Sequence, residues 1–291
     1  MQKSKILVVG GTGYIGKRIV KASLAQGHPT YVLMCRETGY DIEKLQMLLS
    51  FKEQGALLVE GSFSDHQSLV DAVKQVDVVI CTMSGVQFRS HNILLQLKLV
   101  DAIKEAGNIK ETFEDKMVIR KAIEDAKIPY TYISANCLGG YFVGNLSQPG
   151  SLLPPRDRVS VFGDGNLKVV FMDEDDVATY TIKSVDDSRM LNKTLYLRPH
   201  KNILTHNQLI EKWEKLTDQT LEKVHISAED FLASMKDVGD RAFQAGLARI
   251  YHIYYEGCVM NFEIDEEGEE ASKLYPEVRY TRVEEYLQRY L

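Results

Sequence analysis

The sequence predicts an α/β protein with a Rossmann-like, doubly wound parallel sheet and a smaller C-terminal α/β part. The branched apolar run at 6–9 is typical of a buried parallel strand. Gly10, Gly13 and Gly16 follow it at three-residue spacing, and a helix is expected over 17–24. Strand-like and helix-like segments alternate through the first half of the chain. This alternation requires right-handed crossovers and helices on both faces of the sheet.

The next elements keep this alternation. The expected strands share branched apolar residues and cover 30–34, 57–60 and 76–82. The expected helices share amphipathic spacing and cover 42–54, 64–75 and 94–106. In the helix over 42–54 the apolar face is predicted to be Leu45, Leu48 and Leu49, and a Ser-Asp pair caps the helix that follows Ser64.

The alternation fails after residue 110. A helical pattern begins at Glu111 and runs to Asp125, so helix would follow helix where a central strand is expected. We infer that residues are missing between Lys110 and Glu111. A sheet without that strand would have an unfilled position beside its active site.

The second half of the chain has a looser pattern. Strands are expected at 129–135, 159–162, 169–172 and 194–198, and helices at 177–184, 205–216, 228–236 and 283–291. We therefore predict a cofactor-binding domain over 1–136. Residues 137–291 are predicted to form mainly a substrate-binding domain, with some segments returning to the first sheet.

Bulk composition excludes several classes of partner. The 291 residues carry a formal net charge of -6 and no basic cluster, so nucleic acid and anionic membranes are not expected partners. We expect no signal peptide, and the sequence contains no apolar run long enough to span a bilayer. The four cysteines lie far apart without a CxxC pair, which favours buried free thiols over disulfides or zinc ligands. We expect a cytoplasmic protein.

The glycine-rich loop predicts a dinucleotide site. A turn without side chains lets the backbone approach a pyrophosphate, and the following helix offers free N–H groups and a partial positive charge. The alternative is a tight turn in an α/β protein without a nucleotide. The loop residues expected to bind the cofactor are Gly10, Gly11, Thr12, Gly13, Tyr14, Ile15 and Gly16.

The end of the second strand favours NADPH over NADH. Arg36 provides a planar cation suited to a 2′-phosphate, and Lys44 could add a second charge. Glu37 argues the other way, because a carboxylate in this region can bind a ribose hydroxyl. A solvated arginine and lysine remain the alternative. We expect a preference for NADPH of about tenfold or more.

One lysine is a candidate for the chemistry. Tyr40 and Lys44 match the Tyr-x-x-x-Lys pattern of short-chain dehydrogenases, but they lie beside the second strand and not at the active-site helix. Lys116 and Arg120 are four residues apart and share a helix face, as expected if a phosphate or reacting oxygen lies between them. The alternative is a solvated amphipathic helix.

Taken together, these motifs resemble the plant isoflavone-reductase-like family of atypical short-chain reductases. The resemblance spans nearly the whole chain and is closest to the pinoresinol–lariciresinol reductase branch. Members carry a further strand and loop between Lys110 and Glu111. The matching segments are 10–16, 62–65, 83–86, 89–91, 115–120, 128–132, 163–166, 174–178 and 271–278, with 134–137 and 255–258 marking the branch.

The resemblance implies roles for individual residues. Lys116 would be the catalytic acid/base, and His252 and Phe142 would face the substrate. Relatives tend to have Arg-Pro-Glu where this chain has Cys35-Arg36-Glu37, which weakens the case for Arg36 relative to Lys44. The implied cofactor contacts beyond the glycine loop are Arg36, Lys44, Ser84, Gly85, Arg120 and Asn136.

Three of these segments have other interpretations. By itself, a histidine among aromatic residues, as at His252, is more often a packing residue. Leu138, Tyr141 and Phe142 form either core or a pocket wall. The acids over 173–176 could suggest a metal site, but a helix N-terminus at Val177 explains them better, and no metal is expected.

The implied activity is reduction of benzylic ether rings in furofuran and furan lignans with NADPH. Lys116 would accept a phenolic proton, the benzylic ether would open to a quinone methide, and hydride addition would follow. Two related activities remain open: reduction of phenylcoumaran benzylic ethers and reduction of isoflavones. A non-catalytic NADP-sensing regulator is the alternative from another class. The family also implies a homodimer.

Overall fold

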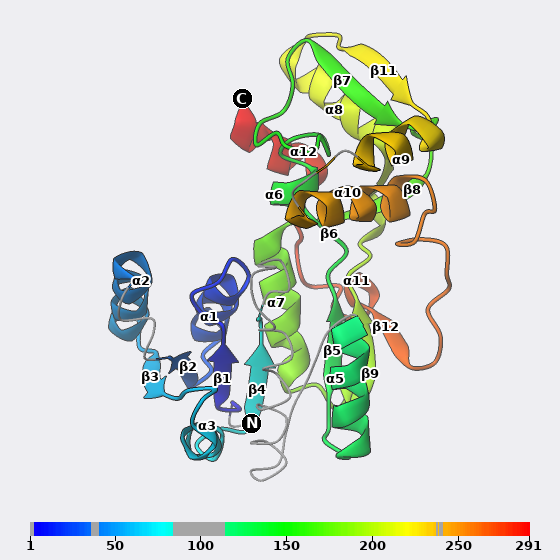
Figure 1. Ribbon diagram of the computed structural model, residues 1–291. Helices are drawn as coiled ribbons and strands as arrows, with labels where there is room; N and C mark the ends of the chain where they lie inside the picture. The colour runs from blue at the N-terminus through cyan, green and yellow to red at the C-terminus, as the bar shows by residue number, and fades with distance from the viewer. Residues whose placement is uncertain (1–2, 36–40, 84–113, 237, 239–240) are drawn as a thin grey trace. The chain divides into compact units, whose positions relative to one another are not determined.

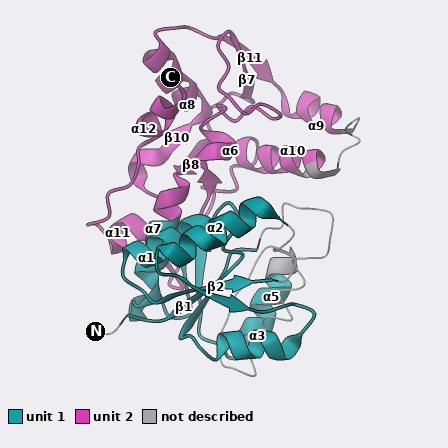
Figure 2. Ribbon diagram, turned by 90° about the vertical axis from the view of Figure 1, so that its left-hand side faces the viewer, with its two compact units in different colours: residues 1–133, 178–195 teal, residues 134–177, 196–291 magenta. Residues whose placement is uncertain are grey.

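The structure is a computed structural model that describes residues 3–35, 41–83, 114–236, 238 and 241–291 (Figure 1). The chain forms two compact units (Figure 2). Unit 1 comprises residues 1–133 and 178–195, and unit 2 comprises residues 134–177 and 196–291. The chain thus returns to unit 1 once after entering unit 2.

Unit 1 is built on a four-stranded sheet of order β3-β2-β1-β4. Every neighbouring pair is parallel, and the register places Val8 beside Val32 and Ile80. Because the strands are parallel, their carboxyl ends meet at one edge of the sheet, where open α/β sheets bind their ligands. The strands are β1 (Ile6–Val9), β2 (Thr30–Met34), β3 (Leu57–Glu60) and β4 (Val78–Cys81).

Both faces of this sheet are covered by helices (Figure 2). Side chains alternate along β1, so Ile6 and Val8 pack in one cluster and Leu7 and Val9 in another. This arrangement confirms the predicted α/β doubly wound class. One face is covered by α1 (Gly16–Ala25), α2 (Ile42–Glu53) and α7 (Glu174–Val185), the other by α3 (His66–Val73) and α5 (Glu114–Asp125).

The predicted face of helix α2 is wrong in part. Leu48 is buried as expected, but Leu45 and Leu49 are exposed, and Phe51 takes their place in the core. Leu48 and Phe51 are three residues apart and therefore lie on the side of the helix that meets the sheet. Asp65 caps α3 through the backbone N–H of Ser68, as predicted. The expected helix over 94–106 lies outside the described residues.

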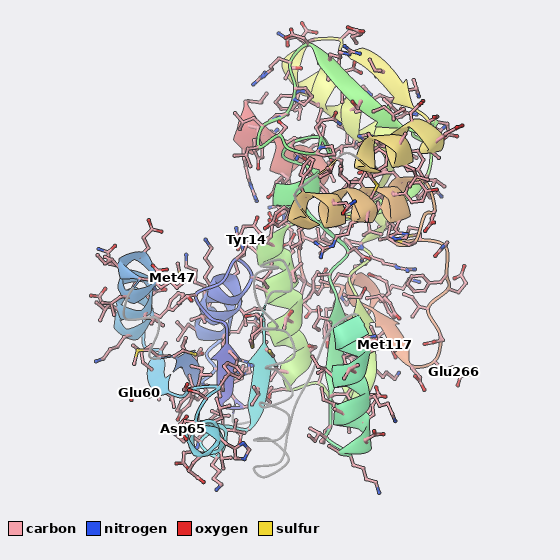
Figure 3. All side chains as sticks on the ribbon, viewed as in Figure 1. Tyr14, Met47, Glu60, Asp65, Met117 and Glu266 are labelled. Atoms are coloured by element: carbon pink, nitrogen blue, oxygen red, sulfur yellow. The ribbon has the colours of Figure 1, made fainter. Side chains whose placement is uncertain are left out.

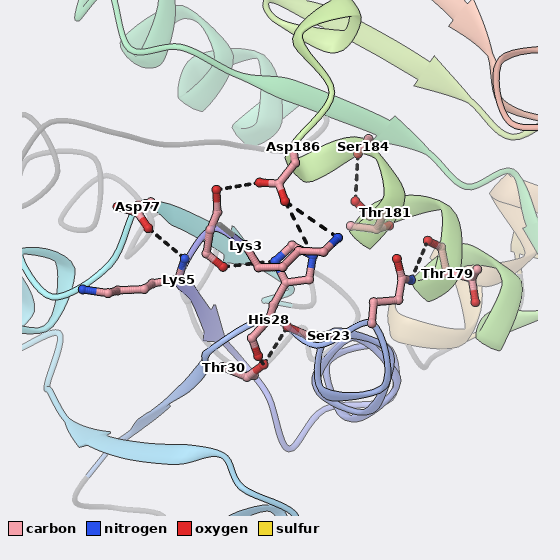
Figure 4. Close-up of polar contacts among 12 residues, drawn as sticks. Lys3, Lys5, Ser23, His28, Thr30, Asp77, Thr179, Thr181, Ser184 and Asp186 are labelled. Carbon is pink, nitrogen blue, oxygen red and sulfur yellow. Dashed lines mark hydrogen bonds and ion pairs between the residues drawn. The ribbon is translucent and has the colours of Figure 1, made fainter. Parts of the chain in front are cut away.

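The segment that returns to unit 1 is tied to the start of β1 (Figure 4). Asp186, just after α7, accepts a hydrogen bond from the Ser4 hydroxyl at 2.6 Å. The His28 ring contacts the Ser4 carbonyl oxygen at 3.0 Å. The returning chain then forms η2 (Ser188–Met190) and β9 (Lys193–Tyr196), and β9 neighbours β5 (Thr131–Ser134).

Among its described residues, unit 2 combines short strands with six α-helices and two 3₁₀-helices. Its core surrounds Trp213, which is fully buried and donates from Nε1 to the Pro155 carbonyl oxygen at 3.1 Å. The strands are β6 (Cys137–Leu138), β7 (Arg158–Phe162), β8 (Lys168–Met172), β10 (Ile203–Thr205), β11 (Glu222–Ile226) and β12 (Gly268–Glu270). The helices are α6 (Gly139–Phe142), α8 (His206–Thr217), α9 (Ala228–Lys236), α10 (Arg241–Tyr254), α11 (Ala271–Leu274) and α12 (Val283–Leu287), with η3 (His200–Asn202) and η4 (Gln288–Tyr290).

A strained turn follows α6 and is held by buried polar groups. Leu146 and Ser147 have φ of 52° and 60°, a conformation that costs energy for residues with a Cβ. The His206 ring contacts the Leu146 carbonyl oxygen at 3.0 Å, and burial lowers the pKa of His206 to about 4. The hydroxyl groups of Tyr254 and Ser147 form a hydrogen bond of 2.5 Å. A neutral histidine and a tyrosine, both distant in sequence, therefore stabilise this turn.

Two composition-based predictions can be compared with the structure. The four cysteines, all within the described ranges, form no disulfide, but only Cys137 is buried and Cys258 is exposed. Among the residues placed in the structure, no helix is both long and apolar enough to span a bilayer.

Candidate functional site

The glycine loop between β1 and α1 has no room for side chains at two positions. A Cβ on Gly16 would lie 2.0 Å from the Gly10 carbonyl oxygen, far inside any real contact distance. Gly10 has φ of 82°, which only glycine adopts without strain. The Gly13 amide donates to the Gly10 carbonyl at 2.9 Å and closes the turn. The backbone of this loop is therefore bare toward a ligand, as a pyrophosphate requires.

The loop is also braced from β4. The Thr82 hydroxyl donates to the Val9 carbonyl at 2.9 Å and lies 3.2 Å from the Gly10 carbonyl. A Cβ on Gly10 or Gly16 would come within 3.0 Å of Thr82 Oγ1. The motif was predicted from the sequence, but the role of Thr82 was missed. A hydroxyl residue at the end of the neighbouring parallel strand was the available signal.

The start of α1 is suited to an anion. Its N-cap residue, Ile15, makes no side-chain capping bond, and its first turn has no acidic residue. The backbone dipole therefore presents partial positive charge at the loop without an internal counter-charge. Tyr14 lies at this end of α1 and is 39% exposed, with the Arg18 guanidinium 4.5 Å from its ring (Figure 3). Bare backbone and a free helix dipole together fit a dinucleotide pyrophosphate.

The predicted 2′-phosphate contacts are described only in part. Lys44 lies in the first turn of α2 and pairs with the capping residue Asp41 at 2.7 Å. The Lys44 side chain and amide hold the pKa of the Asp41 carboxyl below its usual range. Lys44 is about half exposed and can also reach solvent. Arg36, Glu37 and Tyr40 lie outside the described residues.

Helix α5 contains the predicted catalytic lysine in its first turn. The side chain of Lys116 lies outside the part of the chain that is described, as do Ser84 and Gly85. Ile119 and Ile123 of the same helix are buried against Leu7 and Val9 of the sheet. Met117, one position after Lys116, is exposed (Figure 3).

Arg120 is held by an aromatic ring. Its guanidinium lies 4.0 Å from the centre of the Tyr132 ring, and the Tyr132 hydroxyl donates to Glu124 at 2.9 Å. Such stacking positions a planar cation over the ring face. The arrangement connects α5 to β5 and keeps a positive charge one helical turn from Lys116.

Asn136 connects the strand ends of unit 2. It has φ of 56°, and its side-chain amide donates to the Leu197 carbonyl oxygen at 2.7 Å. The amide nitrogen is thereby used within the protein. The same nitrogen also lies 3.5 Å from the Ser134 carbonyl oxygen, which leaves the Oδ1 atom for the predicted cofactor contact.

The aromatic cluster after β6 has two environments. Phe142 packs against the unit 2 core while remaining partly accessible, and its carbonyl accepts the Ser147 hydroxyl at 2.8 Å. Tyr141 is 54% exposed and does not belong to the core. Phe142 is thus placed by the strained turn that His206 and Tyr254 hold.

His252 lies in the last turn of α10 and is exposed. Its Nδ1 atom lies 2.5 Å from a carboxylate oxygen of Glu256. The side chains of His252 and Glu256 are 59% and 50% exposed. The histidine is therefore not a buried packing residue, and it has a carboxylate partner that the sequence prediction missed. The spacing of four residues was the available signal.

The acids at the start of α7 have structural partners. Glu174 accepts hydrogen bonds from the Gly140 amide and the Tyr286 hydroxyl, and Asp173 pairs with Arg289. Asp176 accepts from the Thr281 amide at 2.7 Å. The helix begins at Glu174 rather than at Val177, and these acids anchor the C-terminal segment. No group of three potential metal ligands occurs within the described ranges.

Comparison with known proteins gives a consistent picture. The NmrA-like family model matches residues 2–113 and 109–287. An isoflavone reductase homolog of Lupinus albus is 64% identical over 313 positions, covering all of both chains. A bifunctional pinoresinol-lariciresinol reductase of Linum perenne is 61% identical over 315 positions, again over all of both chains.

The fold also matches that of a solved structure. A solved structure of AtPrR2 with NADP+ and (+)pinoresinol is 55% identical, has a TM-score of 0.95 and covers all of both chains. The resemblance predicted from the motifs is confirmed. On the extent of the family match and on these identities, the chain belongs to the NmrA-like family.

Proposed function

We propose that this protein is an NADPH-dependent reductase that opens benzylic ether rings of furofuran and furan lignans, converting pinoresinol to lariciresinol and then to secoisolariciresinol. The observation that carries the proposal is the full-length similarity to a reductase named for both steps, at 61% identity. The glycine loop supports it independently, because its geometry fits a dinucleotide.

The residues of unit 1 would hold the cofactor. The loop over 10–16 would bind the pyrophosphate through backbone amides, and Lys44 and Arg36 would contact the 2′-phosphate. When bound, NADPH supplies the hydride that reduces the benzylic carbon. Ser84, Gly85, Arg120 and Asn136 are proposed as further contacts.

Lys116 is the proposed acid/base. Its neutral amine would accept the proton of the substrate phenol, which otherwise ionises near pH 10 by analogy with tyrosine. The phenolate then expels the benzylic ether oxygen, which takes up a proton, and a quinone methide forms on the substrate. Arg120, which is stacked on Tyr132 at 4.0 Å and is four residues along the same helix, would favour the neutral amine as a neighbouring cation.

Unit 2 would contribute the substrate contacts. His252 is exposed and would contact a substrate oxygen, and Phe142 would face an aromatic ring of the lignan. We further propose that the protein acts as a homodimer in the cytoplasm, as the family resemblance implies. Light scattering of the purified protein tests the oligomeric state.

The central test is product analysis with racemic pinoresinol and NADPH. Chiral chromatography is expected to show lariciresinol and secoisolariciresinol, with one enantiomer consumed first. Lys116→Ala should lower kcat by about 100-fold or more while NADPH still binds. Lys121→Ala is the control, because Lys121 is exposed on the same helix and pairs with Asp125. Normal single-turnover reduction by Lys116→Ala would refute the role of this lysine.

The two related enzyme activities are separated by the same assay. Dehydrodiconiferyl alcohol tests phenylcoumaran ether reduction, and an isoflavone tests the activity named in the Lupinus relative. If the protein binds NADPH but reduces none of these substrates, the result would favour the alternative of a non-catalytic NADP-sensing regulator.

We also propose that the chain lacks a segment between Lys110 and Glu111. The two family matches meet at residues 109–113, and the Lupinus alignment spans 313 positions against 291 residues here. Within the described residues, β4 has one strand neighbour, β1, while β5 pairs with β9 in a separate sheet. A strand between β4 and β5 would join these two sheets.

This second proposal has its own test. The counterpart segment of the Lupinus relative is inserted between Lys110 and Glu111, and both chains are expressed. The extended chain should have the higher Tm, the tighter NADPH binding and the higher kcat/KM. Equal Tm and equal NADPH affinity of the two chains would overturn the proposal.

A further inference from the structure

The end of helix α10 holds His252 and Glu256 in a defined relation. His252 is in the last turn of α10, and Glu256 lies four residues later, just beyond the end of the helix. His252 Nδ1 and Glu256 Oε2 are 2.5 Å apart. Glu256 also belongs to the segment 255–258, which marks the branch in the sequence and which the proposed mechanism does not use.

The backbone around Glu256 is fixed on both sides. Gly257 adopts φ of 68° and turns the chain, and the Cys258 amide donates to the His252 carbonyl oxygen at 3.0 Å. The Tyr255 hydroxyl donates to the Ile226 carbonyl oxygen at 2.9 Å and connects the turn to β11. The carboxylate is thus presented to the ring by a closed turn rather than by a free surface chain.

This contact determines which ring nitrogen carries a proton. An ionised carboxylate can only accept hydrogen bonds, so Nδ1 must be the donor. In a singly protonated ring Nε2 is then left with a lone pair, and it becomes a donor only if the ring gains a second proton. Carboxylates that bond one imidazole nitrogen fix the ring orientation and the tautomer in many sites.

We propose that Glu256 is a positioning residue that orients His252 and makes its Nε2 atom a hydrogen-bond acceptor for a hydroxyl of the lignan. The inference rests on the proposed function, because it requires His252 to meet the substrate. It also refines that function: a substrate with a phenolic or primary alcohol O–H is recognised at this point, and one whose only oxygen there is an ether or carbonyl is not.

Nuclear magnetic resonance tests the tautomer without any substrate. In ¹⁵N-labelled protein, at a pH where the ring carries a single proton, His252 is expected to show a protonated Nδ1 and an unprotonated Nε2. Glu256→Ala should abolish this preference, and Glu256→Gln should retain most of it, because the amide oxygen can still accept from Nδ1. A protonated Nε2 and bare Nδ1 in the unmodified protein would overturn the assignment.

Kinetics test the role in recognition. Glu256→Ala should raise KM for pinoresinol about three- to tenfold with kcat nearly unchanged, the size of one hydrogen bond. Glu256→Gln should restore most of the loss. His252→Ala combined with Glu256→Ala should be no worse than His252→Ala alone, because the carboxylate acts through the ring.

Glu266→Ala is the matched control, since Glu266 is an exposed acid of the same unit (Figure 3). An unchanged KM in Glu256→Ala, or an equal rise in Glu266→Ala, would overturn the inference while the reductase function stands. If the unmodified protein reduces no lignan, the proposed function fails, and the tautomer measurement still decides whether Glu256 orients the ring.

Discussion

The glycine loop of unit 1 presents backbone groups, whereas the end of α10 in unit 2 presents side chains. In the loop, the proposed cofactor contact depends on missing side chains: a Cβ on Gly16 would lie 2.0 Å from a carbonyl oxygen. At the end of α10, the proposed substrate contact depends on a side-chain pair, and Phe142 is placed by residues distant in sequence, His206 and Tyr254. A backbone-built site is local in sequence, whereas a side-chain-built site depends on packing between distant segments.

The largest expected effect comes from filling the loop. Gly16→Ala should abolish measurable NADPH binding, a loss of about 100-fold or more, because the loop must open to relieve the clash. Fluorescence titration with NADPH measures the affinity. Gly246→Ala in α10 is the control, since a Cβ there meets no described atom within 4 Å and should be neutral or slightly stabilising. Normal NADPH affinity of Gly16→Ala would show that the loop does not hold the cofactor.

A substitution in the core of unit 2 should lower the stability of the protein without changing its affinity for NADPH. Trp213→Ala removes a fully buried ring and its bond to Pro155, at a cost of about 3–5 kcal/mol. Urea unfolding measures this loss, and NADPH affinity at low temperature should stay within about twofold. Leu153→Ala, at an exposed position, is the control. A parallel loss of NADPH affinity would contradict the contrast between the two units.

The buried carboxyl of Asp176 in unit 2 should make the free energy of unfolding depend on pH. Burial, reinforced by the charges of Asp173 and Asp175, raises the pKa of Asp176 to about 7 from 3.8. Between these values the folded protein keeps a proton that the unfolded chain has released. The stability contributed by this proton is therefore full below about pH 4 and is lost as pH rises through about 7.

Asp176→Asn tests this dependence, because the amide oxygen can still accept from the Thr281 amide. The variant should be about 4 kcal/mol more stable than the unmodified protein at pH 8 and nearly equal to it at pH 4. Urea unfolding at the two pH values measures the difference. Asp157→Asn, at an exposed position, should show no such pH dependence. A stability difference that does not change with pH would contradict the assignment.

The smallest expected effect concerns the choice of nucleotide. Lys44→Ala should weaken NADPH binding about three- to tenfold and leave NADH binding unchanged, because only NADPH has the 2′-phosphate. Lys52→Ala, at the other end of α2, is the control. Equal loss for both nucleotides would show that Lys44 acts on α2 through Asp41 rather than on the phosphate.

Local signals in the sequence predicted much of the fold. Helix α9 and strand β3 have the predicted limits, and each has a local signal at one end: Ser227 caps α9 through the Asp230 amide, and Gly61 follows β3. The face of α2 was wrong, since Leu45, Leu48 and Leu49 satisfy the spacing equally well and only packing selects Leu48 and Phe51. The long helix α10 was missed.

The amino-acid sequence by itself determined the glycine loop, the alternation of strands and helices that produces a parallel sheet, and the family. These depend on short motifs of residues adjacent in the chain. The tertiary structure decided that Thr82 braces the loop, that His206 holds the strained turn and that the acids of α7 bind the C-terminal segment. Such contacts join residues far apart in sequence, and their partners are selected by packing, which no local pattern specifies.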